Sequence, residues 1–176
     1  MVFWLTKENY LDEVMIISLL NFESLKDPRF FWLSLFGVGL IKPAPGTIAS
    51  LLTVLLWWFF LSDLSFIYQV ALLCTYVVFS ILLYRSFAET VAVEDPSEVV
   101  ADEFAGMWLA LIFLPKEIAS VAAAFLVFRL LDIGKPFFIG WIDKNVHGGL
   151  GVMADDLVAG AVTSLLLLLA VYSITS

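Results

Sequence analysis

Cysteine, histidine and basic residues are scarce in this chain. Its one cysteine, Cys74, excludes an intrachain disulfide and any metal site built from several cysteines. Because Cys74 lies inside a long apolar stretch, we expect it to be a buried packing residue. Nine Lys and Arg stand against 17 Asp and Glu, giving a net charge of −8, which argues against nucleic acid as a partner. The N-terminus has no basic leader with a small-residue cleavage site, so no signal peptide is expected.

Hydrophobic residues are abundant: they make up 62% of the chain, and the mean hydropathy is +1.00. Values this far from those of soluble domains indicate that the bilayer is the solvent. We therefore predict an all-α, polytopic membrane protein with about five membrane-embedded helices, the third of which is either short or re-entrant. The apolar blocks are Ile48–Leu61, Phe66–Tyr84, Phe104–Leu114, Ile118–Leu131 and Leu157–Ile174.

The first 36 residues have a different pattern, and we predict that they form interfacial helices ahead of a helical core over residues 37–176. Apolar side chains recur at spacings of three and four between Leu11 and Phe22, as in a helix lying on a membrane surface. Asp27 and Pro28 are typical of the N-cap and first position of a second short helix. The whole chain, 1–176, is interpreted as one domain.

Charge distribution predicts how the chain is oriented. With five spans and a cytoplasmic N-terminus, eight of the nine basic residues fall on the inner side and only Lys116 falls outside. This bias matches the positive-inside rule. The same topology puts 15 of the 17 acidic residues inside, leaving Asp63 and Glu117 outside. The inner face is therefore where we expect the functional site.

Two acidic pairs, Asp102-Glu103 and Asp155-Asp156, each open an apolar stretch and each have a glycine four positions after one member, Gly106 or Gly160. Small residues let helices approach closely, so the two pairs are expected to meet. Asp132, at the inner end of the fourth block, would join them. Clustered carboxylates stay ionised only near a cation, and such oxygen-rich sites suit magnesium or manganese. Ordinary helix capping explains one carboxylate per helix but not two doublets.

Groups suited to binding phosphate lie beside these acids. Each also has a simpler interpretation. Arg129 could only pair with Asp132, Lys42 could only mark the inner membrane interface, and the glycines could only form turns with positive φ. His147, the only histidine, is equally consistent with a surface loop residue and with a phosphate ligand or proton donor. The phosphate-binding candidates are Arg129, Lys135, Lys42, His147, Gly148-Gly149 and Gly46-Thr47.

Metal and phosphate at a membrane face point to chemistry on a lipid headgroup. Several known sequence motifs for such chemistry are absent. They are the cysteine followed by a phosphate-binding loop, Asp-x-Asp-x-Thr, the two-histidine signature of membrane phosphatases, and the aspartate-rich motif of CDP-alcohol transferases. Metal-assisted hydrolysis, with water or a carboxylate as nucleophile, remains.

Three segments together resemble the phosphatidylglycerophosphatase A family, in order and spacing, over roughly residues 37 to 160. They are "GVGLIKPAPGTIAS", "DPSEVVADEFAGMWLALIFLP" and "FRLLDIGKPFFIGWIDKNVHGGLGVMADDLVAG". The resemblance implies a Mg²⁺-dependent enzyme of the bacterial inner membrane. It would convert phosphatidylglycerophosphate to phosphatidylglycerol from the cytoplasmic side.

The resemblance also implies site residues. The family's first acidic motif falls on Asp95, Glu98, Asp102 and Glu103, and its second on Asp132, Asp143, Asp155 and Asp156. Its basic positions fall on Arg129 and Lys135. The chain departs from the family pattern at Ala49, Phe137, Phe138 and Gly140.

Our hypothesis is that one or two Mg²⁺ ions bind the phosphomonoester and activate the nucleophile, while Arg129 and Lys135 neutralise charge on the phosphoryl group. Phosphatidic acid or another lipid phosphate is an alternative substrate. A membrane transporter whose carboxylates bind an ion, or a membrane scaffold protein, is an alternative class. The expected metal ligands are Asp102, Glu103, Asp132, Asp155 and Asp156; the expected phosphate-side residues are Lys42, Gly46, Thr47, Asp95, Lys135, Asp143, His147, Gly148 and Gly149.

Overall fold

The computed structural model describes residues 20–90 and 96–175, and every regular element in these ranges is a helix, as predicted. The predicted helix between Leu11 and Phe22 lies almost wholly outside the described residues, as does Asp95. The elements are the 3-10 helix η1 (Phe22–Lys26), α2 (Pro28–Leu33), the 3-10 helix η2 (Val38–Leu40), α3 (Pro45–Leu56), the π-helical turn η3 (Trp57–Leu61), α4 (Phe66–Ala88), α5 (Ala101–Leu111), α6 (Ile118–Gly134), α7 (Phe137–Asn145) and α8 (Gly148–Thr175).

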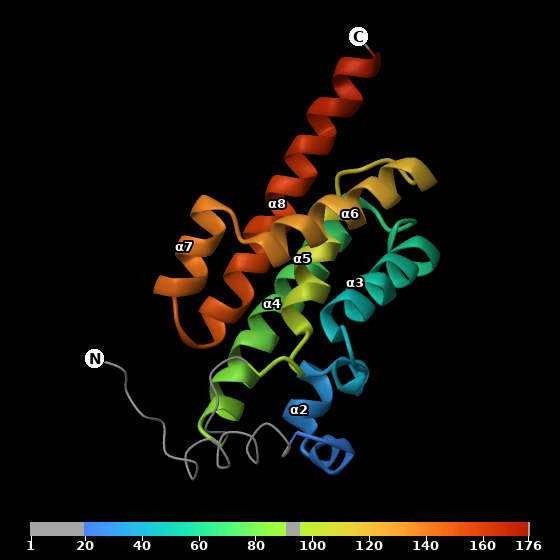
Figure 1. Cartoon of the computed structure of the whole chain (residues 1–176). Coiled ribbons are helices and arrows are strands. Elements are labelled where there is room, and N and C mark those ends of the chain that lie inside the picture. Colours follow the sequence, from blue (N-terminus) through green and yellow to red (C-terminus); the bar gives the residue numbers. More distant parts are fainter. Residues whose placement is uncertain (1–19, 91–95, 176) are drawn as a thin grey trace, which may run out of the picture.

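Helix α5 forms the centre of the fold (Figure 1). Nine of its 11 residues are buried, and it packs against α3, α4, α6 and α8. Its apolar side chains point in almost every direction around the helix axis, and in this fold other helices cover them. Its N-terminal turn, which carries Asp102 and Glu103, is consequently held inside the bundle.

Helix α2 closes one end of the bundle beside the end of α4 and the beginning of α3 (Figure 1). Asp27 is its N-cap and accepts a hydrogen bond from the backbone N–H of Arg29, and Pro28 is its first residue, which confirms the sequence interpretation. Phe30 and Leu33 are buried against the end of α4, and the Leu33 carbonyl accepts a 2.9 Å hydrogen bond from the Val100 N–H. This contact fixes the chain just before α5 begins.

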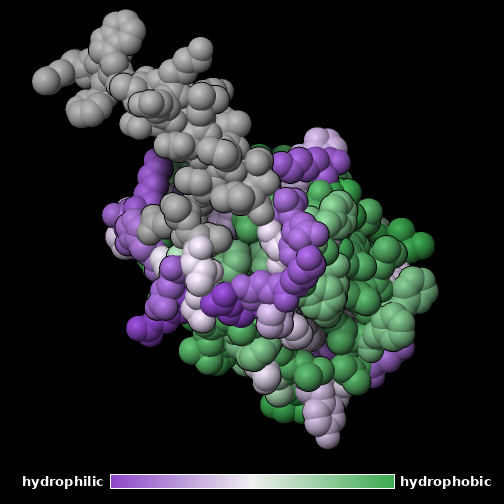
Figure 2. Space-filling view, turned by 90° about the horizontal axis from the view of Figure 1, so that it is seen from below, coloured by the Kyte–Doolittle hydropathy of each residue, from purple (hydrophilic) through white to green (hydrophobic). Residues whose placement is uncertain are grey.

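Two helices, α4 and the segment Gly148–Ser173 of α8, are long and apolar enough to cross a membrane. The continuous stretch Pro45–Leu61 is apolar but shorter, and α5 and α6 have 11 and 17 residues. The count of about five membrane-embedded helices stays a prediction. Seen from the α2 end, hydrophilic side chains gather beside a broad hydrophobic flank (Figure 2).

Cys74 corrects one expectation. It is exposed on α4, and only 17% of the most apolar stretch of that helix is buried within the molecule. An apolar stretch in a membrane helix does not identify a buried face, because lipid-facing positions are apolar too. The sequence argument for burial of Cys74 was therefore wrong.

Candidate active site

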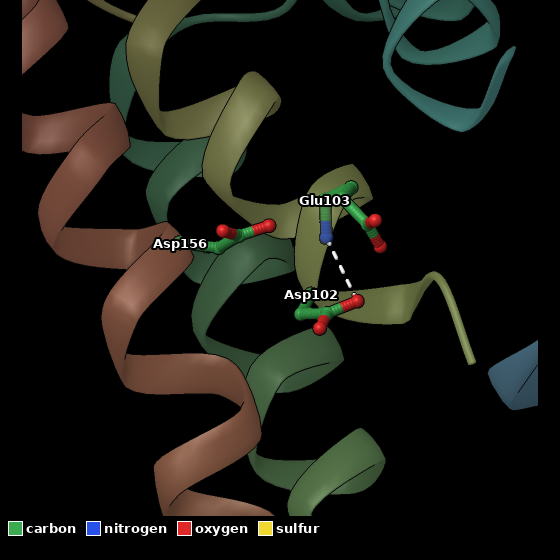
Figure 3. A group of neighbouring side chains, drawn as sticks. All are labelled: Asp102, Glu103 and Asp156. Carbon is green, nitrogen blue, oxygen red and sulfur yellow. Dashed lines mark hydrogen bonds between the residues drawn. The ribbon is translucent and has the colours of Figure 1, made fainter. Parts of the chain in front are cut away.

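Three acidic side chains meet where the first turn of α5 faces α8. Asp102 and Glu103 come from α5, and Asp156 comes from the third turn of α8 with its side chain directed toward α5 (Figure 3). One carboxylate oxygen from each lies within 4.8 Å of the others. Within the described ranges, this is the one group of His, Cys, Asp or Glu side chains that close together. The Glu103 backbone N–H donates a 3.0 Å hydrogen bond to Asp102 Oδ1 and so orients that carboxylate.

The two helices approach closely because glycines face each other at their contact. A Cβ atom at Gly106 would lie 2.5 Å from the Asp156 carbonyl oxygen, and one at Gly160 would overlap the Gly106 carbonyl oxygen. Only hydrogen atoms fit between these backbones. The glycine spacing in the sequence predicted this approach, and the structure confirms it.

Asp132 and Arg129, both on α6, lie beside the acidic cluster. Arg129 Nη1 forms an ion pair with Asp132 Oδ2, and the Asp132 and Asp156 side chains are close enough to interact through a hydrogen bond. Arg129 Nη1 also donates a 3.4 Å hydrogen bond to the Ser50 hydroxyl of α3. The Arg129 side chain is 14% exposed, and its Nε has no hydrogen-bond partner in the described part of the chain. This guanidinium therefore retains an unused donor.

The N-terminus of α3 covers the other side of Glu103. A Cβ atom at Gly46 would overlap Glu103 Oε1 and lie 3.3 Å from Arg129 Nη1. Pro45 and Gly46 occupy the first turn of α3, where unpaired backbone N–H groups and the helix dipole favour negative charge. Thr47, half-buried, follows in the same turn. The arrangement surrounds the carboxylates with a helix N-terminus and a guanidinium.

The cluster has the chemistry of a site for a divalent cation. Glu103 Oε2 and Asp156 Oδ2 are buried and have no hydrogen-bond partner in residues 20–90 and 96–175. Burial, reinforced by the Asp156 and Asp132 carboxylates, raises the pKa of Glu103 to about 8. Buried carboxylate oxygens without donors are costly unless a cation balances them. The donor set of three carboxylates suits magnesium, which takes oxygen ligands in octahedral geometry.

Asp155, the neighbour of Asp156, points elsewhere. Successive residues of a helix are about 100° apart around its axis, and of this doublet only Asp156 is directed toward α5. Asp155 Oδ2 accepts a 2.8 Å hydrogen bond from Lys135 Nζ, which also pairs with Asp143. Burial disfavours the Lys135 ammonium, but its hydrogen bonds to these two acids outweigh that effect and raise its pKa. Lys135, Asp143 and Asp155 thus form a second ionic group.

This second group lies beside a polar cavity of about 120 Å³ between the ends of α4 and α7 and the start of α8. Asp143, Asp155 and the exposed His147 line it, together with Tyr84 and Gly148. Gly148 has φ +70°, as its turn requires, whereas Gly149 packs against the Ile81 carbonyl of α4. The Gly-Gly pair therefore makes a turn and a helix contact.

Lys42, the remaining expected phosphate-side residue, forms a 3.6 Å ion pair with Glu98. Its side chain is 66% exposed, whereas that of Glu98 is 4% exposed. A Cβ atom at Gly39 would overlap the Glu98 carbonyl oxygen, so the chain before α3 packs closely against the chain before α5. Lys42 thus pairs with Glu98 and is not part of the three-carboxylate cluster.

The model of the phosphatidylglycerophosphatase A family matches residues 31–171, most of this chain. The chain belongs to the phosphatidylglycerophosphatase A family. The matched region contains every acidic and basic residue of the candidate site and all helices from α3 to α7.

Curated relatives agree with membership of the phosphatidylglycerophosphatase A family. The chain is 38% identical to phosphatidylglycerophosphatase A of Escherichia coli over 130 residues, which covers 73% of this chain and 75% of that protein. It is also 38% identical to phosphatidylglycerophosphatase A of Haemophilus influenzae, over 70% of this chain and 77% of the relative. A Bacteroides thetaiotaomicron protein, provisionally named a phosphatidylinositol-3-phosphatase, is 36% identical over 77% of this chain and 88% of its own length. No solved structure gave a significant match. These similarities establish that the chain is a phosphatase.

One contributor to this site, Ser50, was not found from the sequence; its hydroxyl accepts a hydrogen bond from Arg129. Gly46 was predicted as a phosphate-side turn residue, whereas in the structure its lack of a side chain lets Glu103 pack against it. Their spacing of four residues on α3 places them on one face and was the available signal.

Proposed function

We propose that the chain hydrolyses phosphatidylglycerophosphate to phosphatidylglycerol and inorganic phosphate, with Mg²⁺ held by Asp102, Glu103 and Asp156. The observation that carries this proposal is the α5–α8 carboxylate cluster, in which Glu103 Oε2 and Asp156 Oδ2 are buried without a hydrogen-bond donor in the described chain, beside an arginine with an unused N–H. Family membership supplies the reaction type. Asp132 supports the cluster through its contact with Asp156, and Asp155 supports it by fixing Lys135.

When bound, magnesium supplies Lewis-acid stabilisation of the phosphoryl oxygens and assists formation of the nucleophile. Side chains and backbone groups of the protein bind the phosphoryl group. Arg129 binds the phosphoryl group through its free Nε, and the first turn of α3 adds backbone N–H groups. Lys135 adds positive charge at the cavity lined by His147. In the reaction water adds to phosphorus, the phosphorus–oxygen ester bond breaks, and a proton passes to the leaving alkoxide.

The substrate assignment follows the names of the Escherichia coli and Haemophilus influenzae relatives. The name of the Bacteroides thetaiotaomicron relative favours a second candidate, a phosphoinositide monophosphate, and phosphatidic acid shares the same chemistry. All three are phosphomonoesters on a diacyl lipid, and the acidic cluster acts on that shared group. Selectivity among them has to come from contacts beyond the phosphate.

We further propose that the chain spans the bacterial inner membrane several times, with the N-terminus and the site at the cytoplasmic face. Two long apolar helices and the distribution of Lys and Arg support this orientation. A transporter is disfavoured because α8 has no charged residue after Asp156 and α4 has only Arg85, in its last turn.

A substrate panel tests this function directly. Purified protein in detergent is expected to release phosphate from phosphatidylglycerophosphate with added Mg²⁺ and to lose nearly all release in EDTA. Phosphatidic acid and phosphatidylinositol 3-phosphate are assayed alongside at equal mole fraction. A higher kcat/KM for either would reassign the substrate, and inertness toward all three lipids would contradict a phosphatase function.

The raised pKa of Glu103 predicts how Mg²⁺ activation depends on pH. Below about pH 8 the empty site holds a proton on Glu103, and that proton must leave when the carboxylate binds a metal. The half-activating Mg²⁺ concentration is therefore expected to fall as the pH rises toward 8, by about tenfold per pH unit for each proton that the metal displaces. Metal titrations at each pH measure it, and Glu103→Gln should weaken this dependence. A half-activating concentration independent of pH would contradict the assignment.

A further inference from the structure

An apolar groove of about 600 Å³ separates α3–η3 from α6. Leu51, Val54 and Leu55 form one wall, and Ala122, Phe125 and Leu126 form the other. Leu51, Leu55 and Leu126 are 48–61% exposed, so the groove opens to the surroundings of the protein. Its size falls in the range of small-molecule sites.

The groove leads to the candidate active site. Phe125 lies one turn before Arg129 on α6, and Val54 lies one turn after Ser50 on α3, so the Arg129–Ser50 hydrogen bond stands across its end. At the opposite end Trp58 lines the groove, and the Lys116 ammonium lies 5.8 Å from the Trp58 ring while bonding to Asp63. The groove is thus an apolar channel with a phosphate-binding cation at one end and a charged pair closing the other.

The dimensions fit a lipid chain. The α6 segment from Ile118 to Arg129 extends roughly 16 Å at the rise of an α-helix. One leaflet of a bilayer contains about 15 Å of hydrocarbon. In phosphatidylglycerophosphate two glycerol units joined by a phosphodiester separate the phosphomonoester from the acyl chains. With the phosphomonoester at Arg129, an acyl chain therefore lies along the part of the groove farther from Arg129, around Ala122.

We propose that the α3–α6 groove binds an acyl chain of the lipid substrate while its phosphomonoester lies against Arg129. This inference rests on the proposed function. A second apolar cavity, of about 460 Å³, lies between α3 and α4. Neither cavity has Lys or Arg among its lining residues, but the α3–α6 groove ends one helical turn from Arg129, whereas the α2 end of the second cavity is formed by Trp32 and Phe36. The charge at its end distinguishes the α3–α6 groove.

Two tryptophan substitutions separate the grooves. Ala122 and Thr75 are both exposed; Ala122 lines the α3–α6 groove and Thr75 lines the other cavity. With phosphatidylglycerophosphate carrying two hexadecanoyl chains, Ala122→Trp is expected to lower kcat/KM by about tenfold or more, because the indole fills the groove. With glycerol 3-phosphate, a phosphomonoester that has no acyl chain and is too short to reach Ala122 from Arg129, activity should stay within about twofold. Thr75→Trp should leave both substrates unaffected.

Binding of the long-chain lipid in EDTA, measured by native mass spectrometry, makes the test independent of turnover. Weaker binding by Ala122→Trp but not by Thr75→Trp is expected. If lipid binding shows this pattern but the wild-type protein releases no phosphate, the proposed phosphatase function is refuted, whereas the acyl-chain site is still supported. The proposal that this groove binds the acyl chain would be refuted if wild type and Ala122→Trp bound the lipid equally. It would also be refuted if Thr75→Trp, rather than Ala122→Trp, lost activity on the long-chain lipid alone.

Discussion

Asp156→Asn is expected to lower Mg²⁺-dependent phosphate release by about 10³-fold or more, because it removes a ligand charge worth several kcal/mol at about 1.4 kcal/mol per tenfold. Asparagine has nearly the same shape, so the contact between α8 and α5 is preserved. Asp102→Asn should act similarly, since both side chains belong to the group that can share one ion. Turnover at saturating lipid, measured across a range of Mg²⁺ concentrations, tests this expectation.

A stability measurement separates a ligand from a structural residue. Asp156 is 3% exposed and lies beside other carboxylates, so neutralising it relieves like-charge repulsion. The variant should melt at the same temperature as the wild type in EDTA, or higher, and should lose the stabilisation that Mg²⁺ gives the wild type. Asp63→Asn, an exposed position at the far end of the bundle, is the matched control and should change neither property. Near-normal turnover in Asp156→Asn would refute the metal assignment.

Gly160→Ala is expected to be damaging although it adds only one methyl group. Its Cβ would overlap the Gly106 carbonyl oxygen, and backbone atoms cannot rotate away as a side chain can. The helices must separate, at a cost of about 1–3 kcal/mol for overpacking of this kind. Since Asp102 and Asp156 lie on the two sides of this contact, activity should fall with stability. Gly106→Ala should behave alike, because its Cβ would lie 2.5 Å from the Asp156 carbonyl.

Gly134→Ala is the matched control for both variants. No atom lies within 4 Å of the place where its Cβ would be, so thermal stability and phosphate release should remain close to the wild-type values. Thermal unfolding in detergent, paired with the phosphatase assay, compares the three variants. Wild-type behaviour of Gly160→Ala would show that the two backbones are not in contact in the working enzyme.

The sequence predicted which helices meet but not which way each carboxylate points. Hydropathy identified apolar helices, and the glycines after Asp102 and Asp156 predicted the α5–α8 contact that the structure confirms. A doublet such as Asp155-Asp156 gives no indication of which member faces the partner helix, because that depends on the rotation of α8 about its axis. The structure turns Asp156 to the cluster and Asp155 to Lys135. The assignment of Asp155 as a metal ligand stays a prediction.

Burial was harder to predict than helix formation. An apolar stretch has the same composition whether lipid or protein surrounds it, which is why exposed Cys74 and buried α5 look alike in the sequence. The contacts of Ser50 and Gly46 with the site also depend on tertiary packing. Only the positions of helices α3 and α6 relative to α5 reveal them.

The contact between Gly106 and Gly160 has a consequence for ion selectivity. The spacing between carboxylates from α5 and α8 is set by backbone touching backbone, so the width of the site does not adjust through side-chain rotamers alone. Magnesium requires oxygen ligands at about 2.0–2.1 Å, whereas calcium takes them at about 2.3–2.6 Å and in larger number. The glycine contact prevents the two helices from moving closer together, and admitting the larger ion by separating them would break that contact.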